Sequence, residues 1–345
     1  MHSWHIYALG GGWGHFTRAL SLARAAAKRG IEVEILANSP WAHLVVNSVN
    51  SAAAETSLRV LLDLPRSIQF RLLPCDASFE ATAKAAADWV RSVDAGVLFV
   101  DTFPRGLGGE LADVLPRSKA RRVWIHRDLD PRYVAEFQLE SFAQHFELIL
   151  VPGEDAPLAH LPQARRTLPW LIADSAELLS PAAARAELGV PGSQPIIAVS
   201  GSGTDDEVRE TGEWAARLES ELAEEARVIW ICAAGASRAP GPPTLSVWPL
   251  LLLLPGVDVL VGSGGYHTVH EARATGTPLV ALPRPRRYDR QGLRLRASER
   301  IESAGELVAR IRAFLVAKKR EPKSPYENGA REAVEIILRS EKRPG

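Results

Sequence analysis

Residues 257–271 combine an apolar run, a cluster of glycines and polar side chains that suit phosphate and ribose binding. The apolar run 257–261 predicts a strand, which stops at the glycine-rich segment 262–265 before a helical pattern begins. Small residues let a ligand approach the backbone, and a helix start offers free N–H groups and the positive end of the helix dipole. Glu271 lies one turn after His267 on the same face, where its carboxylate can bind a ribose diol. This stretch therefore predicts a site for a nucleoside diphosphate.

A second glycine cluster, 10–14, follows an apolar run at 6–9 and leads directly into His15. Its spacing does not match a dinucleotide fingerprint, because His15 or Thr17 stands where the G-x-G-x-x-G pattern requires its third glycine. Asn38 stands where an acidic residue would close the second strand. A nicotinamide or flavin cofactor is therefore disfavoured, and the absence of G-x-x-x-x-G-K-[ST] from the sequence excludes a P-loop.

Both glycine clusters lie between a predicted strand and a predicted helix. The expected elements are a strand at 6–9, a helix at 16–29 and a strand at 31–37 in the first half, and a strand at 196–200, a glycine loop at 201–204 and a helix at 206–223 in the second. Strands that are joined through helices form parallel sheets, so the sequence predicts an α/β protein. The carboxyl ends of such strands line ligand crevices, which makes Asp101, at the end of the apolar run 96–100, a site candidate.

The length of 345 residues predicts two domains, and a proline-rich break separates them. Pro169, Pro181 and Pro191 interrupt the strand and helix pattern in the middle of the chain. We expect a first domain over residues 1–168, a linker over 169–193, a second domain over 194–322, and a C-terminal helix within 323–345 that packs back on the first domain.

Composition narrows the choice of partners and compartment. The formal net charge is zero, so no overall field recruits nucleic acid; a local arginine-rich stretch, 284–300, is either a solvated surface or a phosphate-attracting one. Cys75 and Cys232 are expected to be small buried residues, which suits a reducing compartment. The sequence has no signal-peptide pattern, and its longest apolar segment, 250–254, is too short to span a bilayer. We expect a cytoplasmic protein without a transmembrane segment, for which peripheral contact with the inner face of the membrane stays open.

Three patterns imitate catalytic or metal-binding motifs, and we interpret them as structural. Residues 126–129 imitate a kinase catalytic loop, but the other kinase elements are missing from the sequence. Asp130 precedes Pro131, which is typical of a helix start rather than of a metal-binding acid pair. His267 and His270 are three residues apart, but no third ligand lies nearby in the sequence. We therefore predict no metal site.

The two glycine-containing units resemble those of the two-lobed GT-B glycosyltransferases. The resemblance rests on the G-x-G-H-x-x-R element 12–18 and on the G-G-x-x-[ST]-x-x-E helix 264–271, and it covers most of the chain. The nearest types are the peptidoglycan N-acetylglucosaminyltransferase and the nucleotide-sugar transferases that share its C-terminal domain. The resemblance implies two Rossmann-like domains whose parallel sheets face each other across a central cleft.

This resemblance also implies a nucleotide-sugar co-substrate and no other cofactor. The helix start at 264–268 would hold the diphosphate, Glu271 the ribose, Trp248 the base, and Asp289 with Gln291 the donor sugar. The donor-binding residues implied are Gly12, Gly14, Arg18, Ser202, Gly203, Thr204, Trp248, Gly264, Gly265, Tyr266, His267, Thr268, Glu271, Asp289 and Gln291.

By the same resemblance, His15 would be the general base. An imidazole at a helix start that faces a cleft can take a proton from an acceptor hydroxyl. Asp101 is the candidate carboxylate that would steady this histidine, and a plain loop or helix-start role for Asp101 stays open.

We therefore predict a metal-independent, inverting glycosyltransferase of the hexosyltransferase type. It would move a sugar from a nucleotide diphosphate donor, expected to be a UDP-sugar, to a hydroxyl acceptor whose type the sequence does not define, with a lipid-linked acceptor included. Two alternatives stay open. One is a nucleotide-sugar hydrolase or epimerase of the same fold, because the G-x-G-H-x-x-R element also occurs in a nucleotide-sugar hydrolase of the pseudaminic acid pathway. The other is a non-catalytic nucleotide-sugar-binding subunit.

Overall fold

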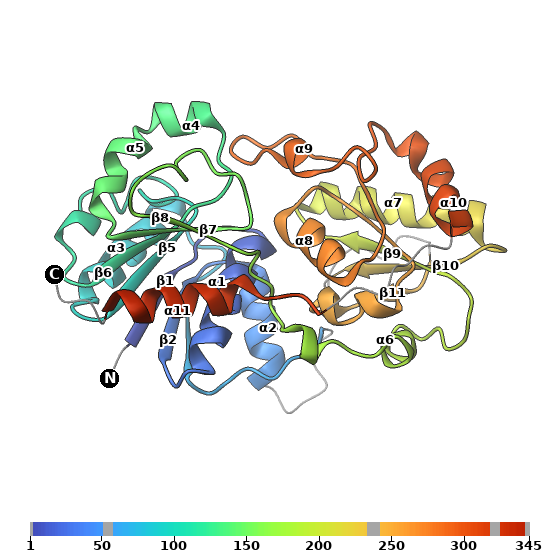
Figure 1. Ribbon diagram of the computed structural model, residues 1–345, viewed down its shortest axis with the longest axis horizontal. Helices are drawn as coiled ribbons and strands as arrows, with labels where there is room; N and C mark the ends of the chain where they lie inside the picture. The colour runs from blue at the N-terminus through green and yellow to red at the C-terminus, as the bar shows by residue number, and fades with distance from the viewer. Residues whose placement is uncertain (1–2, 51–57, 233–241, 318–324, 342–345) are drawn as a thin grey trace.

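The computed structural model describes residues 3–50, 58–232, 242–317 and 325–341, which form two lobes side by side (Figure 1). One lobe is built on a seven-stranded sheet and the other on a five-stranded sheet. The strand pairs within both sheets are parallel. The predicted α/β class with two Rossmann-like units is confirmed. The predicted boundary between residues 322 and 323 lies outside the described residues.

The first lobe has the strand order β4-β2-β1-β5-β6-β7-β8. β5 reads VLFVD and is buried along its whole length, as expected for a parallel strand that helices cover on both faces. The elements of this lobe are β1 (Ser3–Tyr7), α1 (Trp13–Ala27), β2 (Glu32–Ala37), α2 (Pro40–Asn50), β3 (Arg59–Val60), β4 (Ile68–Leu72), α3 (Phe79–Ser92), β5 (Val97–Asp101), β6 (Arg121–Ile125), α4 (Pro131–Glu136), α5 (Leu139–Phe142), β7 (Leu148–Pro152) and β8 (Ala164–Thr167).

The second lobe has the strand order β11-β10-β9-β13-β14 and follows a connection that contains α6 (Pro181–Glu187). Its helix α8 ends at Gly276, whose positive φ of 69° forms a left-handed C-cap that glycine adopts without strain. The elements of this lobe are β9 (Ile196–Gly201), α7 (Asp205–Leu222), β10 (Arg227–Cys232), β11 (Thr244–Leu245), β12 (Val247–Trp248), β13 (Val259–Gly262), α8 (Tyr266–Thr275), β14 (Leu279–Ala281), α9 (Gln291–Arg294) and α10 (Leu307–Ala317).

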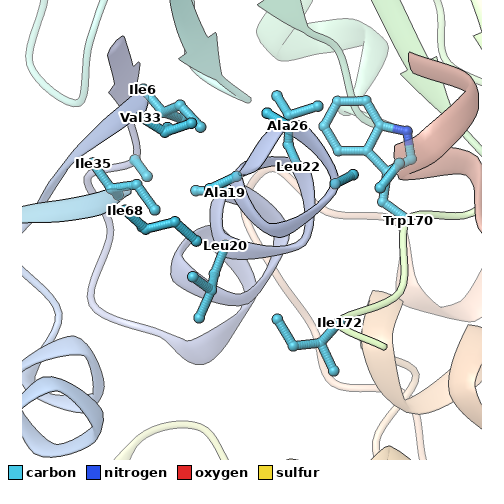
Figure 2. Packing of buried hydrophobic residues seen from close by; sticks show 14 of the residues in the cluster. Ile6, Ala19, Leu20, Leu22, Ala26, Val33, Ile35, Ile68, Trp170 and Ile172 are labelled. Atoms are coloured by element: carbon cyan, nitrogen blue, oxygen red, sulfur yellow. The ribbon is translucent and has the colours of Figure 1, made fainter. Parts of the chain in front are cut away.

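Helix α1 is buried on every side, from Phe16 to Ala26. Figure 2 shows Ile6, Val33 and Ile35 of the sheet against one side of α1, and Trp170 against another. A helix that is covered all round can present small apolar residues in every direction, which explains the alanine-rich sequence of α1. The glycine loop that precedes α1 is thereby attached to the most deeply packed element of the lobe.

The last described helix, α11 (Gly329–Glu341), lies across the first lobe beside α1 (Figure 1). Ala330, Ala333, Val334 and Ile337 recur on one face of α11 and are buried in the core of the first lobe. The start of α11 is fixed by a 3.0 Å hydrogen bond from the Gly329 N–H to the Pro169 carbonyl. The chain therefore crosses to the second lobe and returns.

A short parallel ladder also joins the lobes. β3 of the first lobe pairs with β12 of the second, with Arg59 opposite Val247 and Val60 opposite Trp248. Beside this ladder, Arg59 forms a 2.6 Å ion pair with Glu187. The sequence pattern did not predict this pairing.

Two local expectations need correction, and one is confirmed. Helix α1 begins at Trp13 rather than Phe16, because extended Gly12 serves as its N-cap and the first turn accommodates another glycine. Cys75 is exposed rather than buried, because it lies in the turn between β4 and α3, whereas Cys232 is buried as expected. Asp130 is confirmed as a helix N-cap, since its side chain accepts a hydrogen bond from the Arg132 N–H at 2.8 Å.

Ile337 tests the contribution of the returning helix. Ile337→Ala removes a fully buried side chain between α11 and α1, so it should lower the free energy of unfolding by about 2–5 kcal/mol. Urea unfolding measures the change. Val316→Ala on α10, where the side chain is 81% exposed, is the control and should change stability little. An equally small effect at Ile337 would contradict this packing.

Candidate active site

The predicted site loops lie at the points where the strand order of each sheet reverses. In the first sheet this point lies between β1 and β5, which carry the His15 loop and Asp101 at their carboxyl ends. In the second sheet it lies between β9 and β13, which precede the glycine segments 201–204 and 262–265. Ligands of open α/β sheets bind at such points.

His15 and Asp101 are in direct contact. The Nδ1 atom of His15 lies 2.6 Å from Oδ2 of Asp101, whose carboxylate is fully buried. This contact leaves Nε2 as the imidazole nitrogen that can meet a ligand, and the His15 ring lines a cavity between the lobes. The arrangement matches a base whose ring is oriented by a carboxylate.

Arg18 holds the other side of the Asp101 carboxylate. Its Nε and Nη2 atoms donate hydrogen bonds to both carboxylate oxygens at 2.6 Å, and Nη2 also donates to Thr102 Oγ1 at 2.8 Å. Burial alone would raise the pKa of Asp101, but the Arg18 charge and the His15 contact outweigh burial and lower it well below its usual range. Asp101 is therefore ionised, and Arg18 is directed toward this carboxylate.

Backbone conformation contributes to this arrangement. Thr102 has a positive φ of 62°, a rare conformation for a non-glycine residue, and its carbonyl accepts a 3.1 Å hydrogen bond from the Trp124 indole. Gly10 has a φ of 150°, and a Cβ atom there would lie 2.4 Å from Cδ2 of His15. Only glycine leaves room for the histidine ring at this position.

Helix α8 faces the His15 loop from the other lobe. The Nε2 atom of His267 lies 3.3 Å from the Gly14 carbonyl, which can only accept, so Nε2 carries the proton. The N-cap of α8 is Gly265, which has no capping side chain, so the first N–H groups of this helix remain available to a ligand. The two predicted glycine loops thus meet across the cleft.

Glu271 lies one turn into α8 and is buried with no cation as a hydrogen-bond partner. Burial raises the pKa of this carboxyl to about 8. Its Oε1 atom lies 3.7 Å from Nδ1 of His267, and burial lowers the pKa of that imidazole well below its usual range. Nδ1 of His267 has no hydrogen-bond partner among the residues that the structure describes. Both side chains therefore carry unused hydrogen-bonding capacity at neutral pH.

Two adjoining cavities connect these groups. The smaller is lined by Glu271, Trp248 and Trp13 among other residues. The Trp13 indole stacks on Trp248 at 5.9 Å and on Trp41 at 5.2 Å between ring centroids. The larger cavity is lined by both lobes. Residues that line both are Trp13, Ser202, His267 and Thr268.

The remaining predicted donor contacts also lie at the larger cavity, although some are already bonded within the protein. Thr204 caps α7 by accepting from the Glu207 N–H, and Gly203 has a positive φ of 123°. The side-chain oxygen of Gln291 accepts from the Arg284 N–H at 3.0 Å. Predicted residues that line this cavity are Gly12, Gly14, His15, Arg18, Ser202, Gly203, Thr204, Gly265, Tyr266, His267, Thr268, Asp289 and Gln291. Gly264 packs under it, since a Cβ there would lie 2.9 Å from the Gln291 carbonyl.

A buried ionic chain between the lobes was missed in the sequence. The Glu154 carboxylate of the first lobe binds Arg127 of its own lobe and, at 2.5 Å, Arg294 of the second. Arg294 also binds Asp289 at 2.5 Å. The Arg127 guanidinium lies 4.3 Å from the centre of the Tyr266 ring. Arg127 and Glu154 each lie two residues beyond the end of a strand, β6 and β7 respectively, and this position is the signal that marks them as site candidates.

Neither a metal cluster nor a membrane span is found in the described part of the chain. Within residues 3–50, 58–232, 242–317 and 325–341, no three His, Cys, Asp or Glu side chains are grouped to hold a metal ion. No helix in these ranges is both long and apolar enough to cross a membrane.

Searches by sequence found no matching model of a protein family and no matching curated protein. Solved structures do match. The kitacinnamycin glycotransferase aligns over 98% of this chain and 98% of its own, with 16% identity and a TM-score of 0.58. The Streptomyces sp. SF2575 glycosyltransferase SsfS6, complexed with thymidine diphosphate, aligns over 99% and 100%, with 14% identity and a TM-score of 0.56. Arabidopsis thaliana UGT89C1 complexed with UDP aligns over 99% and 99%, with 14% identity and a TM-score of 0.57.

The chain has the GT-B fold. Its structural neighbours are GT-B glycosyltransferases, and they span nearly its whole length. The finer resemblance to the peptidoglycan N-acetylglucosaminyltransferase stays a prediction. Within the GT-B frame, the His15 loop belongs to the first lobe and helix α8 to the second.

Glu271 makes stability depend on pH. Its pKa is about 8 in the folded chain, whereas an unfolded glutamate titrates near about 4.3, so the folded state retains a proton that the unfolded state releases. The free energy of unfolding should therefore fall as the pH rises from about 5 to about 8. Glu271→Gln removes this titration, so the variant should gain stability over the parent between those pH values, on the order of 3 kcal/mol.

Urea unfolding at several pH values measures this difference. Glu224→Gln, at an exposed position, is the matched control and should give a nearly constant offset. Parallel stability curves for the parent and Glu271→Gln would contradict the burial of an unpaired carboxyl.

Proposed function

We propose that this chain is a glycosyltransferase that transfers a sugar from a nucleoside diphosphate donor to a hydroxyl acceptor. The donor that we propose is a UDP-sugar. The observation that carries the proposal is that His15 and the uncapped start of α8 line one cavity from opposite lobes. A base and a leaving-group site thus lie on opposite sides of the space where a sugar would sit. The GT-B fold and neighbours solved with UDP and thymidine diphosphate support the same reaction class.

In the proposed reaction, Nε2 of His15 takes the proton of the acceptor hydroxyl while Asp101 steadies the resulting imidazolium. The acceptor oxygen attacks the anomeric carbon from the side opposite the diphosphate, so the configuration inverts. The departing diphosphate is stabilised by the N–H groups at the start of α8 and by the hydroxyls of Ser202 and Thr268. These groups would perform the role that a metal ion has in other transferases.

The smaller cavity suits the nucleoside. Trp248 and Trp13, which stack on each other, give this cavity an apolar wall for a base, while Glu271 and His267 offer hydrogen bonds to ribose hydroxyls. At neutral pH the protonated Glu271 carboxyl can donate to one hydroxyl and accept from another. The cavity adjoins the start of α8, so a nucleoside there would direct its diphosphate toward the N–H groups.

Glu271→Ala tests the placement of the ribose. The substitution should weaken the binding of UDP by about 1–3 kcal/mol, because a hydrogen-bonding partner of the ribose is lost. Calorimetric titration measures the affinity, and the thermal shifts produced by UDP, TDP and GDP rank the base. An unaltered UDP affinity would overturn this placement, and the absence of binding by any of the three nucleotides would overturn the nucleotide site itself.

His15→Ala tests the reaction. Loss of the base should lower acceptor-dependent turnover by about 10²–10⁴-fold while nucleotide affinity stays unchanged. His160→Ala, at an exposed position, is the control and should retain activity. Release of UDP from a UDP-sugar is measured with and without a hydroxyl acceptor. Full turnover without an acceptor would instead indicate a hydrolase, and nucleotide binding without turnover would indicate a binding subunit.

A further inference from the structure

Apolar and aromatic side chains line part of the larger cavity, and one of them lies beside His15. The Phe103 ring lies 5.6 Å from the His15 ring, between centroids. Tyr288 reaches this wall from the second lobe and lies 5.7 Å from Phe103 at 74°. The apolar and aromatic residues that line the cavity are Trp13, Phe103, Leu107, Leu129, Tyr266 and Tyr288.

Packing against a third aromatic side chain fixes the positions of the Phe103 and Tyr288 rings. Tyr133 lies behind them, 5.8 Å from Phe103 and 4.4 Å from Tyr288 between ring centroids. The Tyr288 carbonyl accepts a 3.0 Å hydrogen bond from the Asp130 N–H, which fixes the second-lobe loop against the first lobe. The wall therefore forms only when both lobes contribute.

Leu107 also lines the cavity, and the Glu110 carboxylate fixes its backbone. Glu110 accepts hydrogen bonds from the Tyr7 hydroxyl and from the N–H groups of Leu107 at 3.2 Å and Gly108 at 2.8 Å. A Cβ atom at Gly106, which has a φ of 88°, would lie 2.4 Å from Cδ of Glu110. The loop is thus shaped around Glu110, and it presents an exposed leucine to the cavity.

The charged side chains that line the cavity already have partners of opposite charge within the protein. A charged acceptor would compete with these partners for its counter-ion, and breaking the buried pairs of Arg18 and Arg127 is unfavourable because a buried carboxylate would be left uncompensated. The pairs are Arg18 with Asp101, Arg127 with Glu154, Asp128 with Arg290, Glu207 with Arg286, and Asp289 with Arg294.

We propose that the acceptor is an uncharged hydroxyl compound with an apolar, ring-containing body. Its body lies against the wall that Phe103, Leu107 and Tyr288 form, and its hydroxyl lies at Nε2 of His15. This inference rests on the proposed transferase function, because His15 defines where the hydroxyl must be. The anionic part of the donor is served separately by backbone N–H groups at α8. An acceptor that carries its own diphosphate finds no unpaired cation among the residues that line the cavity.

Binding of three probes to the full chain, saturated with UDP, tests the proposal. The probes are 2-naphthol, its anionic sulfonate 2-naphthol-6-sulfonate, and the hydrophilic methyl glucoside, each measured by calorimetric titration. We expect 2-naphthol to bind most tightly, with the other two weaker by about tenfold or more, a difference that burial of one ring system readily supplies. Equal or tighter binding of the sulfonate or the glucoside would overturn the proposal.

Leu107→Asp places a charge in the wall and should weaken 2-naphthol binding by about tenfold, while Leu107→Met should retain it. Val316→Asp, at an exposed position of α10, is the control; helix α10 lies on the side of the second lobe that faces away from the first (Figure 1). UDP affinity should be unchanged in all three variants. An unaltered 2-naphthol affinity in Leu107→Asp would overturn the acceptor wall.

The proposed function can fail separately from this inference. In that case the probes and variants behave as expected, but no sugar is transferred from any UDP-, TDP- or GDP-sugar to 2-naphthol. Conversely, transfer to the glucoside in preference to 2-naphthol would support a transferase and overturn the acceptor class.

Discussion

The geometry of the cleft depends on the ion pairs that the Glu154 carboxylate forms. This carboxylate lies between the guanidinium groups of Arg127 and Arg294, which come from different lobes. Burial alone would raise the pKa of Glu154, but the two arginines outweigh burial and lower it well below the usual range, so the carboxylate is ionised. A buried charge of this kind is tolerated only while its partners stay in place. The relative position of the lobes is thus linked to three side chains.

The candidate site is complete only when the two lobes hold this relative position. The first lobe supplies His15 and Asp101, and the second supplies the start of α8. The contact between Gly14 and His267 brings these halves together. Trp13 belongs to the first lobe but stacks on Trp248 of the second, so the smaller cavity is also shared. Neither lobe alone contains the proposed base, the proposed phosphate site and the proposed nucleoside pocket.

The sequence allowed the fold and the site loops to be predicted because both depend on local patterns. Apolar runs that end in glycine followed by a helical pattern are visible residue by residue, and parallel strands bring their ends to one edge. The pairing of Val60 with Trp248 and the Glu154 chain depend on how the lobes dock, which no local pattern records. The orientation of Gln291 toward Arg284 depends on the fold of its own loop.

The return of α11 to the first lobe has a consequence for biosynthesis. The core around α1 is complete only when Ala333 and Ile337 cover it, yet these residues are synthesised after the whole second lobe. Domains generally fold in order as they leave the ribosome, but here the core of the first lobe waits for a helix that follows the second lobe in the chain. The second lobe can therefore reach its native state before the first. The packing of α11 on α1 then completes the core of the first lobe as a late step of folding.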